Sequence, residues 1–328
     1  MVCLFILAAA ASLVFFVANR PRILIIQSQS AESTRSREFK AGWSRALNEK
    51  HILAKVSWHS LEQDLHPGFE TQTLGALRTI ELEDPDLIVL VDDLANDRIG
   101  RTLASVKTTS LLFVGIDQSP DYYGYIGNDQ ISGIVEQLRL EPFHELISIL
   151  FPESKLKYGV IGIDNPSGRA RMNQLKNCSW SQHVLSDSAL VDNFTDWKKF
   201  IEDHRDVDVL LVLNTAPMME KKGGESEIVP LREVINWTEV NSRPVPIGIE
   251  AGYVTNGGGL AIEQSPRRFG EMAAIRTKEW LNPKPILAQD MHAMEFQVAI
   301  CLSRLSERKL DVPSIYVESA RLSGTLFP

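Results

Sequence analysis

The sequence predicts an α/β protein built from two similar lobes, each with a central parallel sheet. The main observation is a set of short apolar runs that are continuous rather than alternating, which is typical of parallel strands covered by helices on both faces. Polar or small residues end each run, and a helical pattern follows. Six strands are predicted in this way: Ile23–Ile26, Leu87–Val91, Leu111–Val114, Tyr158–Ile163, Val207–Leu213 and Val245–Ile249. A chain of 328 residues is long enough for two lobes of roughly 100–150 residues each.

The first three strands and their surroundings resemble the last three. PRILIIQSQSAES parallels KYGVIGIDNPSGR, DPDLIVLVDDLA parallels DVDVLLVLNTAP, and LLFVGIDQSP parallels PVPIGIEAGY. The repeat is far longer than the period of a solenoid protein. It indicates two lobes of one plan, and chance similarity between unrelated strand–helix units is the alternative.

Apolar stripes predict the helices between these strands. One stripe covers residues 36–49, and another runs from Ile131 to Leu150, where Pro142 should kink or split the helix. Ser265–Pro266 suits the N-cap and first position of a helix that ends near residue 281. The three glycines Gly257–Gly259 precede that helix, and we interpret them as a crossing of the chain from one lobe to the other.

Composition excludes several classes of function. Hydrophobic residues make up 44% and charged residues 23%, as in a globular protein, and the net charge of −8 without a basic run argues against nucleic acid as a partner. The phosphate-binding, dinucleotide, nucleophile-elbow, CxxC and HExxH motifs do not occur, so neither an enzyme nor a cofactor or metal is predicted. Cys178 and Cys301 could pair in an oxidising compartment, but two unrelated thiols are the preferred interpretation.

The first nineteen residues predict a hydrophobic signal or anchor. From Val2 to Ala18 only Ser12 is polar, and this length is just sufficient to span a bilayer. No Lys or Arg precedes the run, and Phe16–Ala18 is a poor cleavage triplet for a secretory signal. An uncleaved membrane anchor or an imperfect signal is therefore favoured over a buried core helix. Either one predicts a periplasmic or otherwise extracytoplasmic location.

The candidate ligand-binding residues follow the carboxyl ends of the predicted strands, because ligands bind outside these ends in open parallel sheets. Hydroxyl and amide side chains beside helix starts suit a carboxylate or another small anion, whereas acidic side chains suit an ammonium group or sugar hydroxyls. Any one of these residues more often caps a helix or forms a turn, so the prediction depends on their recurrence. The candidates are Ser28, Gln29, Ser30, Asp92, Asp93, Asp117, Asn165, Ser167, Asn214, Glu250 and Tyr253.

Several longer segments occur in an order that resembles one known family. They are FKAGWSRAL, DPDLIVLV, GIVEQLRL, YGVIGIDNPSG, PVPIGIEAGYVTNGGGLAIEQSPRRFGEMAA and VAICLSRLSERKLDVPS, between about Pro21 and Pro313. This order resembles the substrate-binding proteins of ABC transporters with the type I periplasmic binding protein fold, and it looks closest to the tryptophan- and tyrosine-binding branch. The segments Gln27–Ser30 and Asp92–Asp93 depart from the family's commoner small or Thr-containing loops, which leaves the ligand open rather than the fold.

The resemblance implies two Rossmann-like lobes joined by a three-crossing hinge, with the ligand held between them. The implied first lobe is residues 20–128 plus 256–288, the second is 129–255, and 289–328 form a C-terminal helix and tail across the hinge. Asn165 and Ser167 match the family's ligand-cradling lip, and Glu250 matches a position where an ammonium group could be paired.

The implied function is delivery of a small, amino-acid-like polar solute to an ABC transporter permease, without catalysis or cofactor. A membrane-tethered ligand-sensing domain of the same fold is the alternative. The sequence does not determine which solute is bound.

Overall fold

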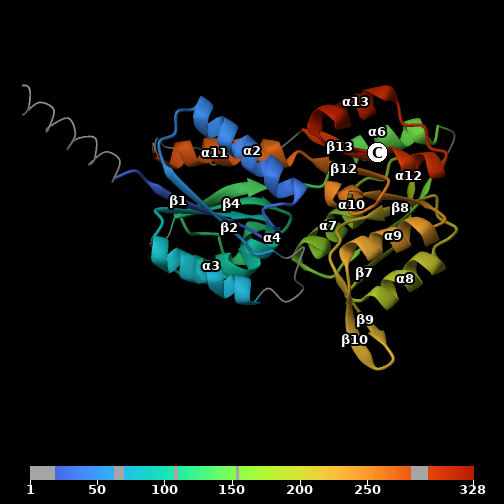
Figure 1. Cartoon of the computed structure of the whole chain (residues 1–328), viewed down its shortest axis with the longest axis horizontal. Coiled ribbons are helices and arrows are strands. Elements are labelled where there is room, and N and C mark those ends of the chain that lie inside the picture. The colour runs from blue at the N-terminus through green and yellow to red at the C-terminus, as the bar shows by residue number, and fades with distance from the viewer. Residues whose placement is uncertain (1–18, 63–69, 107–109, 153–154, 282–294) are drawn as a thin grey trace, which may run out of the picture.

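The computed structural model has two lobes, side by side in Figure 1. It describes residues 19–62, 70–106, 110–152, 155–281 and 295–328. Within these ranges no helix combines the length and the apolar character that a bilayer crossing requires. The predicted hydrophobic signal or anchor, residues 2–18, lies outside the described residues.

The first lobe is built on a five-stranded parallel sheet with the strand order β2-β1-β3-β4-β5. Every residue of β3 and β4 is buried, as their continuous apolar runs predict. Its elements are β1 (Arg22–Gln27), α2 (Thr34–Glu49), β2 (Lys55–Ser60), α3 (Glu70–Glu83), β3 (Leu87–Val91), α4 (Asp92–Ala95), η1 (Asn96–Gly100), α5 (Arg101–Ala104), β4 (Leu111–Ile116), η2 (Pro120–Tyr123) and β5 (Ile131–Val135).

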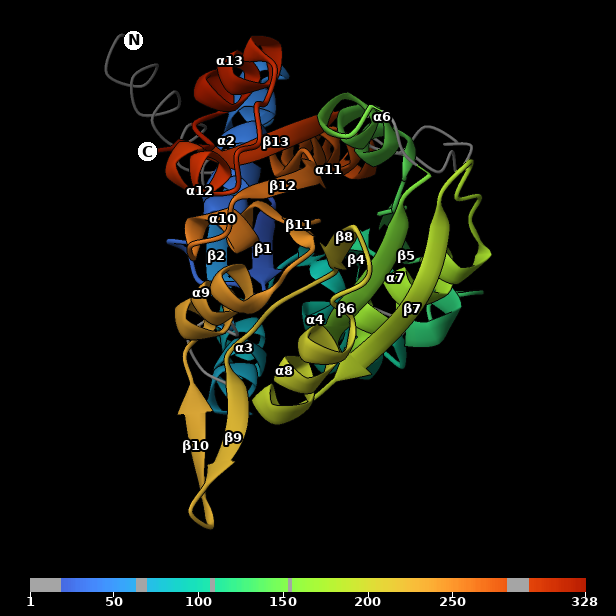
Figure 2. The ribbon, with the colours of Figure 1, turned by 90° about the vertical axis from the view of Figure 1, so that its right-hand side faces the viewer.

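The second lobe has a seven-stranded sheet with the order β14-β13-β12-β11-β8-β6-β7, parallel except where β12 meets β13. A separate antiparallel hairpin, β9–β10, projects from this lobe (Figure 2). The elements up to β11 are α6 (Glu141–Leu150), β6 (Lys157–Ile163), α7 (Pro166–Asn177), β7 (Val184–Val191), α8 (Phe194–Asp203), β8 (Val209–Val212), β9 (Met218–Lys222), β10 (Glu225–Val229), α9 (Leu231–Asn241) and β11 (Val245–Gly248). After β11 follow α10 (Ala251–Thr255), β12 (Leu260–Gln264), α11 (Pro266–Leu281), β13 (Phe296–Cys301), α12 (Leu302–Glu307), α13 (Ser314–Ser323) and β14 (Leu326–Phe327).

The chain passes between the lobes three times, as predicted, but at different places. It leaves the first lobe after β5, returns after β12 at Ser265, and leaves again between α11 and β13. The boundaries predicted after residues 128 and 255 are therefore wrong, because β5 still pairs with β4 and β12 pairs with β13. The glycines Gly257–Gly259 are not the crossing. They lie inside the second lobe, where a Cβ on Gly258 would stand 2.2 Å from the Tyr253 ring.

In two segments that were predicted to be helical, the first residues form a strand instead. Ile131–Val135 is β5, and the helix that follows starts at Glu141, so Pro142 occupies its first turn and causes no kink. The closing segment at residues 298–314 likewise begins within β13 before α12 starts. The C-terminal elements belong to the second lobe rather than spanning the hinge, since Leu305 and Ala320 are buried in its core.

Helix α11 returns to the first lobe and packs along α2 (Figure 1). Its buried residues Phe269 and Met272 join Phe39 and Trp43 in one core cluster. Two glycines allow the helices this close approach. A Cβ on Gly42 would stand 1.9 Å from the carbonyl oxygen of Arg267, and one on Gly270 would stand 2.0 Å from that of Phe39.

Replacing Gly42 by Ala should therefore destabilise the protein, although Ala normally favours a helix over Gly. We expect the free energy of unfolding to fall by about 1–3 kcal/mol, the usual cost of overpacking. Denaturant titration of Gly42→Ala would measure this change. The control is Gly252→Ala in α10, because no atom lies within 4 Å of the added Cβ. An equal loss in both variants would contradict the close helix contact.

Candidate functional site

The carboxyl ends of strands from both lobes border a cleft of about 530 Å³. Segments that follow β1, β3 and β4 supply the first-lobe wall, and segments that follow β6, β8 and β11 supply the wall opposite. This volume lies in the usual range for small-molecule sites, about 300–1,000 Å³. The six strands on which the sequence argument depended therefore converge on one cleft.

Most of the candidate residues line this cleft. They are Gln29, Asp92, Asp93, Asp117, Asn165, Ser167, Asn214 and Glu250. Ser28 and Ser30 are buried behind the first-lobe wall, where the Ser28 hydroxyl donates a 2.5 Å hydrogen bond to Asp92 Oδ2. Contact with a ligand stays a prediction for all of these residues.

Tyr253 is not a cleft residue. Only 1% of it is exposed, and its hydroxyl donates a hydrogen bond to Glu239 Oε1 at 2.9 Å. The short helix α10 starts directly after Glu250, and this turn carries Tyr253 inward to the second-lobe core. Tyr253 was predicted to line the cleft because it follows Glu250 by only three residues.

The guanidinium group of Arg171, on α7, joins the two lobes at the base of the cleft. Its Nε lies 2.9 Å from Asp117 Oδ1 of the first lobe, and its Nη1 lies 2.5 Å from Glu250 Oε1 of the second. Only 4% of the Arg171 side chain is exposed. Arg171 was not among the residues predicted from the sequence, although its spacing of four residues from Ser167 places both on one helix face.

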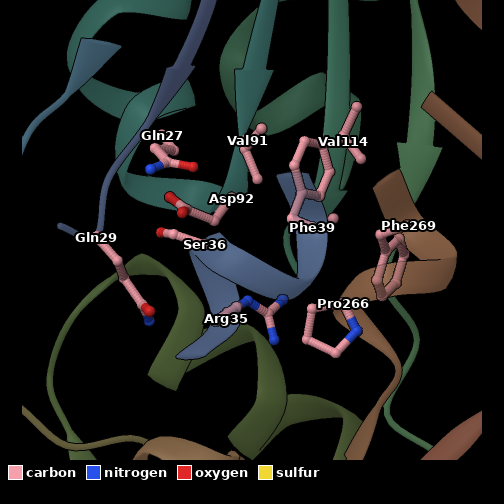
Figure 3. Close-up of a pocket in the computed structure, with 11 residues that line it drawn as sticks. Gln27, Gln29, Arg35, Ser36, Phe39, Val91, Asp92, Val114, Pro266 and Phe269 are labelled. Atoms are coloured by element: carbon pink, nitrogen blue, oxygen red, sulfur yellow. The ribbon is translucent and has the colours of Figure 1, made fainter. Parts of the chain in front are cut away.

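Arg35, in the first turn of α2, is a second, partly buried cation that was not predicted from the sequence. Its Nη2 lies 2.6 Å from Glu136 Oε2, and its Nη1 lies 4.0 Å from Glu263 Oε2. In Figure 3 Arg35 lies between Gln29 and Pro266. Glu136 and Glu263 were missed because they lie just after or within strands that were not assigned from the sequence.

Several cleft residues shape the strand ends themselves. Asp93 accepts hydrogen bonds from the backbone N–H groups of Asp117 and Gln118, at 2.9 and 3.0 Å, and from the Tyr123 hydroxyl. It thereby fixes the loop after β4. Both carboxylate oxygens of Asp93 thus accept hydrogen bonds from donors of the first lobe.

Asn165 is the N-cap of α7. Its Oδ1 accepts hydrogen bonds from the Gly168 N–H group at 2.8 Å and from Asn214 Nδ2 at 2.9 Å. The Asn214 Oδ1 in turn accepts from the Ile163 N–H group at 2.8 Å. The two amides therefore hold the loops after β6 and β8 together.

The acidic groups of the cleft are hard to ionise. Burial raises the pKa of Asp92 to about 6, and the hydrogen bond from Ser28 offsets only part of this rise. Burial also raises the pKa of Asp117 and of Glu263, each to about 7, and it raises the pKa of Glu136. The nearby guanidinium groups lower these pKa values only in part.

The raised pKa of Asp92 can be tested through the pH dependence of stability. A raised pKa in the folded state means that its contribution to stability is full below pH 3.8 and is lost as the pH rises to about 6. The Asp92→Asn variant should lack this loss, and Asn tolerates the left-handed backbone at residue 92, where φ is 70°.

Between pH 4 and pH 7.5 the stability of Asp92→Asn should therefore rise relative to wild type by about 1–3 kcal/mol. Denaturant titrations at both pH values would measure the change. The exposed Asp129→Asn is the control. If the difference in stability between Asp92→Asn and wild type were the same at both pH values, the raised pKa of Asp92 would be contradicted.

The cap at Asn165 predicts a loss of stability. Replacing Asn165 by Ala removes an N-cap and the bond to Asn214, so we expect the free energy of unfolding to fall by about 1–2 kcal/mol. Asn193→Ala is a matched control, because Asn193 caps α8 through a 2.9 Å bond from the Asp196 N–H group. In thermal melts, the melting temperature of Asn165→Ala should be equal to or lower than that of Asn193→Ala. An unchanged melting temperature for Asn165→Ala would contradict its role as a cap.

Comparison with known proteins identifies the fold. No family model and no curated protein matches the sequence. Among solved structures, a conserved domain protein from Vibrio cholerae has a TM-score of 0.67 at 15% identity, over 94% of this chain and all of that one. An ABC domain from Streptococcus pneumoniae in complex with L-Trp has a TM-score of 0.63 at 14% identity, over 90% of this chain and 98% of that one.

The chain has the type I periplasmic binding protein fold. This confirms the fold class predicted from the sequence. A glucose-galactose binding protein from Geobacillus stearothermophilus is also similar, with a TM-score of 0.58 at 10% identity, over 86% of this chain and 98% of that one. The fold is thus used by proteins whose ligands are as different as an amino acid and a sugar.

Proposed function

We propose that this protein is a solute-binding protein that captures a small polar solute between its two lobes. One observation carries the proposal: the loops after six parallel strands, three from each lobe, face a single cleft of about 530 Å³. Such a site meets a small solute from two sides. The similarity to binding proteins for L-Trp and for glucose and galactose supports the same use of the fold.

The contacts across the base of the cleft suit a hinge. Gln118 Nε2 donates to the Pro166 carbonyl oxygen at 3.0 Å, Gln174 Nε2 donates to the Asp117 carbonyl oxygen at 3.1 Å, and the Ser167 hydroxyl donates to Asp117 Oδ2 at 2.6 Å. All three bonds join the first lobe to α7. Rotation of the lobes would change them, and a solute that contacts both walls would favour the closed form.

A closed, loaded form differs in shape from an empty one, so a membrane transporter can distinguish them. We therefore propose an extracytoplasmic protein that delivers its solute to an ABC transporter permease and has no catalytic role. An amino-acid-like solute is compatible with the mixed charges of the cleft.

A screen of solutes tests the proposal. The full chain, purified in detergent, should show a raised melting temperature with at least one amino acid, sugar, amine or organic acid. At 100 times its dissociation constant a solute should stabilise the fold by about 2.7 kcal/mol. Small-angle scattering with the same solute should show a smaller radius of gyration. Turnover of a substrate without any stabilising solute would contradict the proposal.

A further inference from the structure

The base of the cleft contains more acidic than basic groups. Two guanidinium groups, those of Arg35 and Arg171, face four carboxylates at distances of 4.0 Å or less. These carboxylates belong to Asp117, Glu136, Glu250 and Glu263. If all six groups were ionised, two positive and four negative charges would give a net charge of −2; burial raises the pKa of Asp117 and of Glu263 to about 7, so near neutral pH bound protons offset part of this excess, and a cation can replace them. Most of these six groups are buried, so water screens the excess poorly.

The charges nearer the mouth do not compensate the excess. Asp97 lies 2.7 Å from Arg101, and Asp164 lies 2.5 Å from Arg169, so each acid already has a basic partner. These two pairs are neutral, so they supply no net positive charge to the base; Arg98, an exposed residue, also lines the cleft.

Some backbone donors beside the cleft are already used by the chain itself. The N–H groups of Gly168 and Ala251, in the first turns of α7 and α10, donate to the side chains of Asn165 and Glu263, and that of Ala95, the last residue of α4, donates to Asp92. Asp93 likewise takes the N–H groups that follow β4. A carboxylate or phosphate would have to displace these bonds to use the same N–H groups.

One buried acceptor lacks a donor at the same place. Gln264 is 5% exposed, and its Oε1 has no hydrogen-bond partner among the described residues. It lines a void of about 10 Å³, room for about one water. Asp117, Arg171 and Glu263 line both this void and the cleft, so the two are adjacent. This oxygen can accept a hydrogen bond from a solute N–H group or from a water, whereas the buried Arg35 Nη1, which also has no hydrogen-bond partner among the described residues, lies 4.0 Å from Glu263 Oε2.

The cleft lining also limits the kind of cation. Its apolar side chains are aliphatic, among them Leu94, Ile163 and Leu231, and none of the described lining residues is aromatic. A quaternary ammonium group is usually held by an aromatic cage, which this wall does not offer. Nor do the described residues contain a group of His, Cys, Asp or Glu arranged to hold a metal ion.

We propose that the cleft selects an aliphatic solute bearing a protonated amine or guanidinium group, whose N–H donors bind carboxylates of the two walls. This inference rests on the proposed solute-binding function and narrows it. Asp92 of the first lobe and Glu250 of the second are the partly exposed acids that would reach the cation from opposite sides. Glu263 and Gln264 Oε1 lie deeper and can be reached through a bridging water.

Calorimetric titration of the full chain tests the charge preference. The probes are 1,4-diaminobutane and arginine amide, with D-glucose as a neutral comparator and glutarate as an anionic one of similar size. We expect the better amine probe to bind at least about tenfold more tightly than either comparator, a difference of about 1.4 kcal/mol. Its affinity should weaken as salt is raised from 50 to 500 mM, because part of the attraction is between charges.

Variants locate the site. Glu250→Gln keeps the size of the side chain and should weaken amine binding at least tenfold. Asp129→Asn, which removes an exposed charge that is not part of the cleft lining, should leave it unchanged. A melting curve is recorded for each variant. If Glu250→Gln is unfolded, Asp92→Asn replaces it, since Asn suits the positive φ at residue 92.

The outcomes separate this inference from the proposed function. Tight binding of glucose or glutarate without amine binding, or equal amine affinity in wild type and in the folded cleft variant, overturns the amine preference and leaves a solute-binding protein. If no probe binds and no solute of any class shifts the melt, the proposed function fails as well.

Discussion

The ion pairs of Arg171 are the contact on which the arrangement of the cleft depends. This side chain begins on the second lobe and is held by Asp117 of the first lobe and by Glu250 of its own. Removing a charge from water costs several kcal/mol, and that cost is recovered only if every partner is in place. The position of one lobe against the other is therefore tied to the correct placement of the loops after β4, β6 and β11.

The packing of α11 against α2 makes such placement possible. The chain completes a strand of the second sheet, crosses at Ser265 and forms a helix that covers the first sheet. Gly42 and Gly270 let the two helix backbones approach closely, so the returning helix is firmly joined to the first-lobe core. Each lobe thus has its own core, so the two can rotate against each other as units.

Polar residues at the strand ends divide into two groups with different roles. Asp93, Asn165 and Asn214 are occupied by hydrogen bonds that shape the loops on which they lie. Asp92 and Glu250 keep part of their surface toward the cleft. The first group gives the walls their form, and the second leaves charge for a solute, because a carboxylate that is not fully used inside the protein can still bind a donor.

The sequence by itself indicated an α/β fold with covered parallel sheets, because continuous apolar runs such as those of β3 and β4 are typical of strands buried on both faces, and the order of longer segments resembled type I periplasmic binding proteins. It also found most of the strand ends that border the cleft, since these follow directly from strand positions. It could not find Arg35, Arg171 or Glu263. Their partners lie tens of residues away in the chain, and only the folded lobes bring them within hydrogen-bonding or ion-pair distance. The lobe boundaries were likewise decided by tertiary structure, because Leu260–Gln264 could join either sheet until its pairing with Phe296–Cys301 placed it in the second.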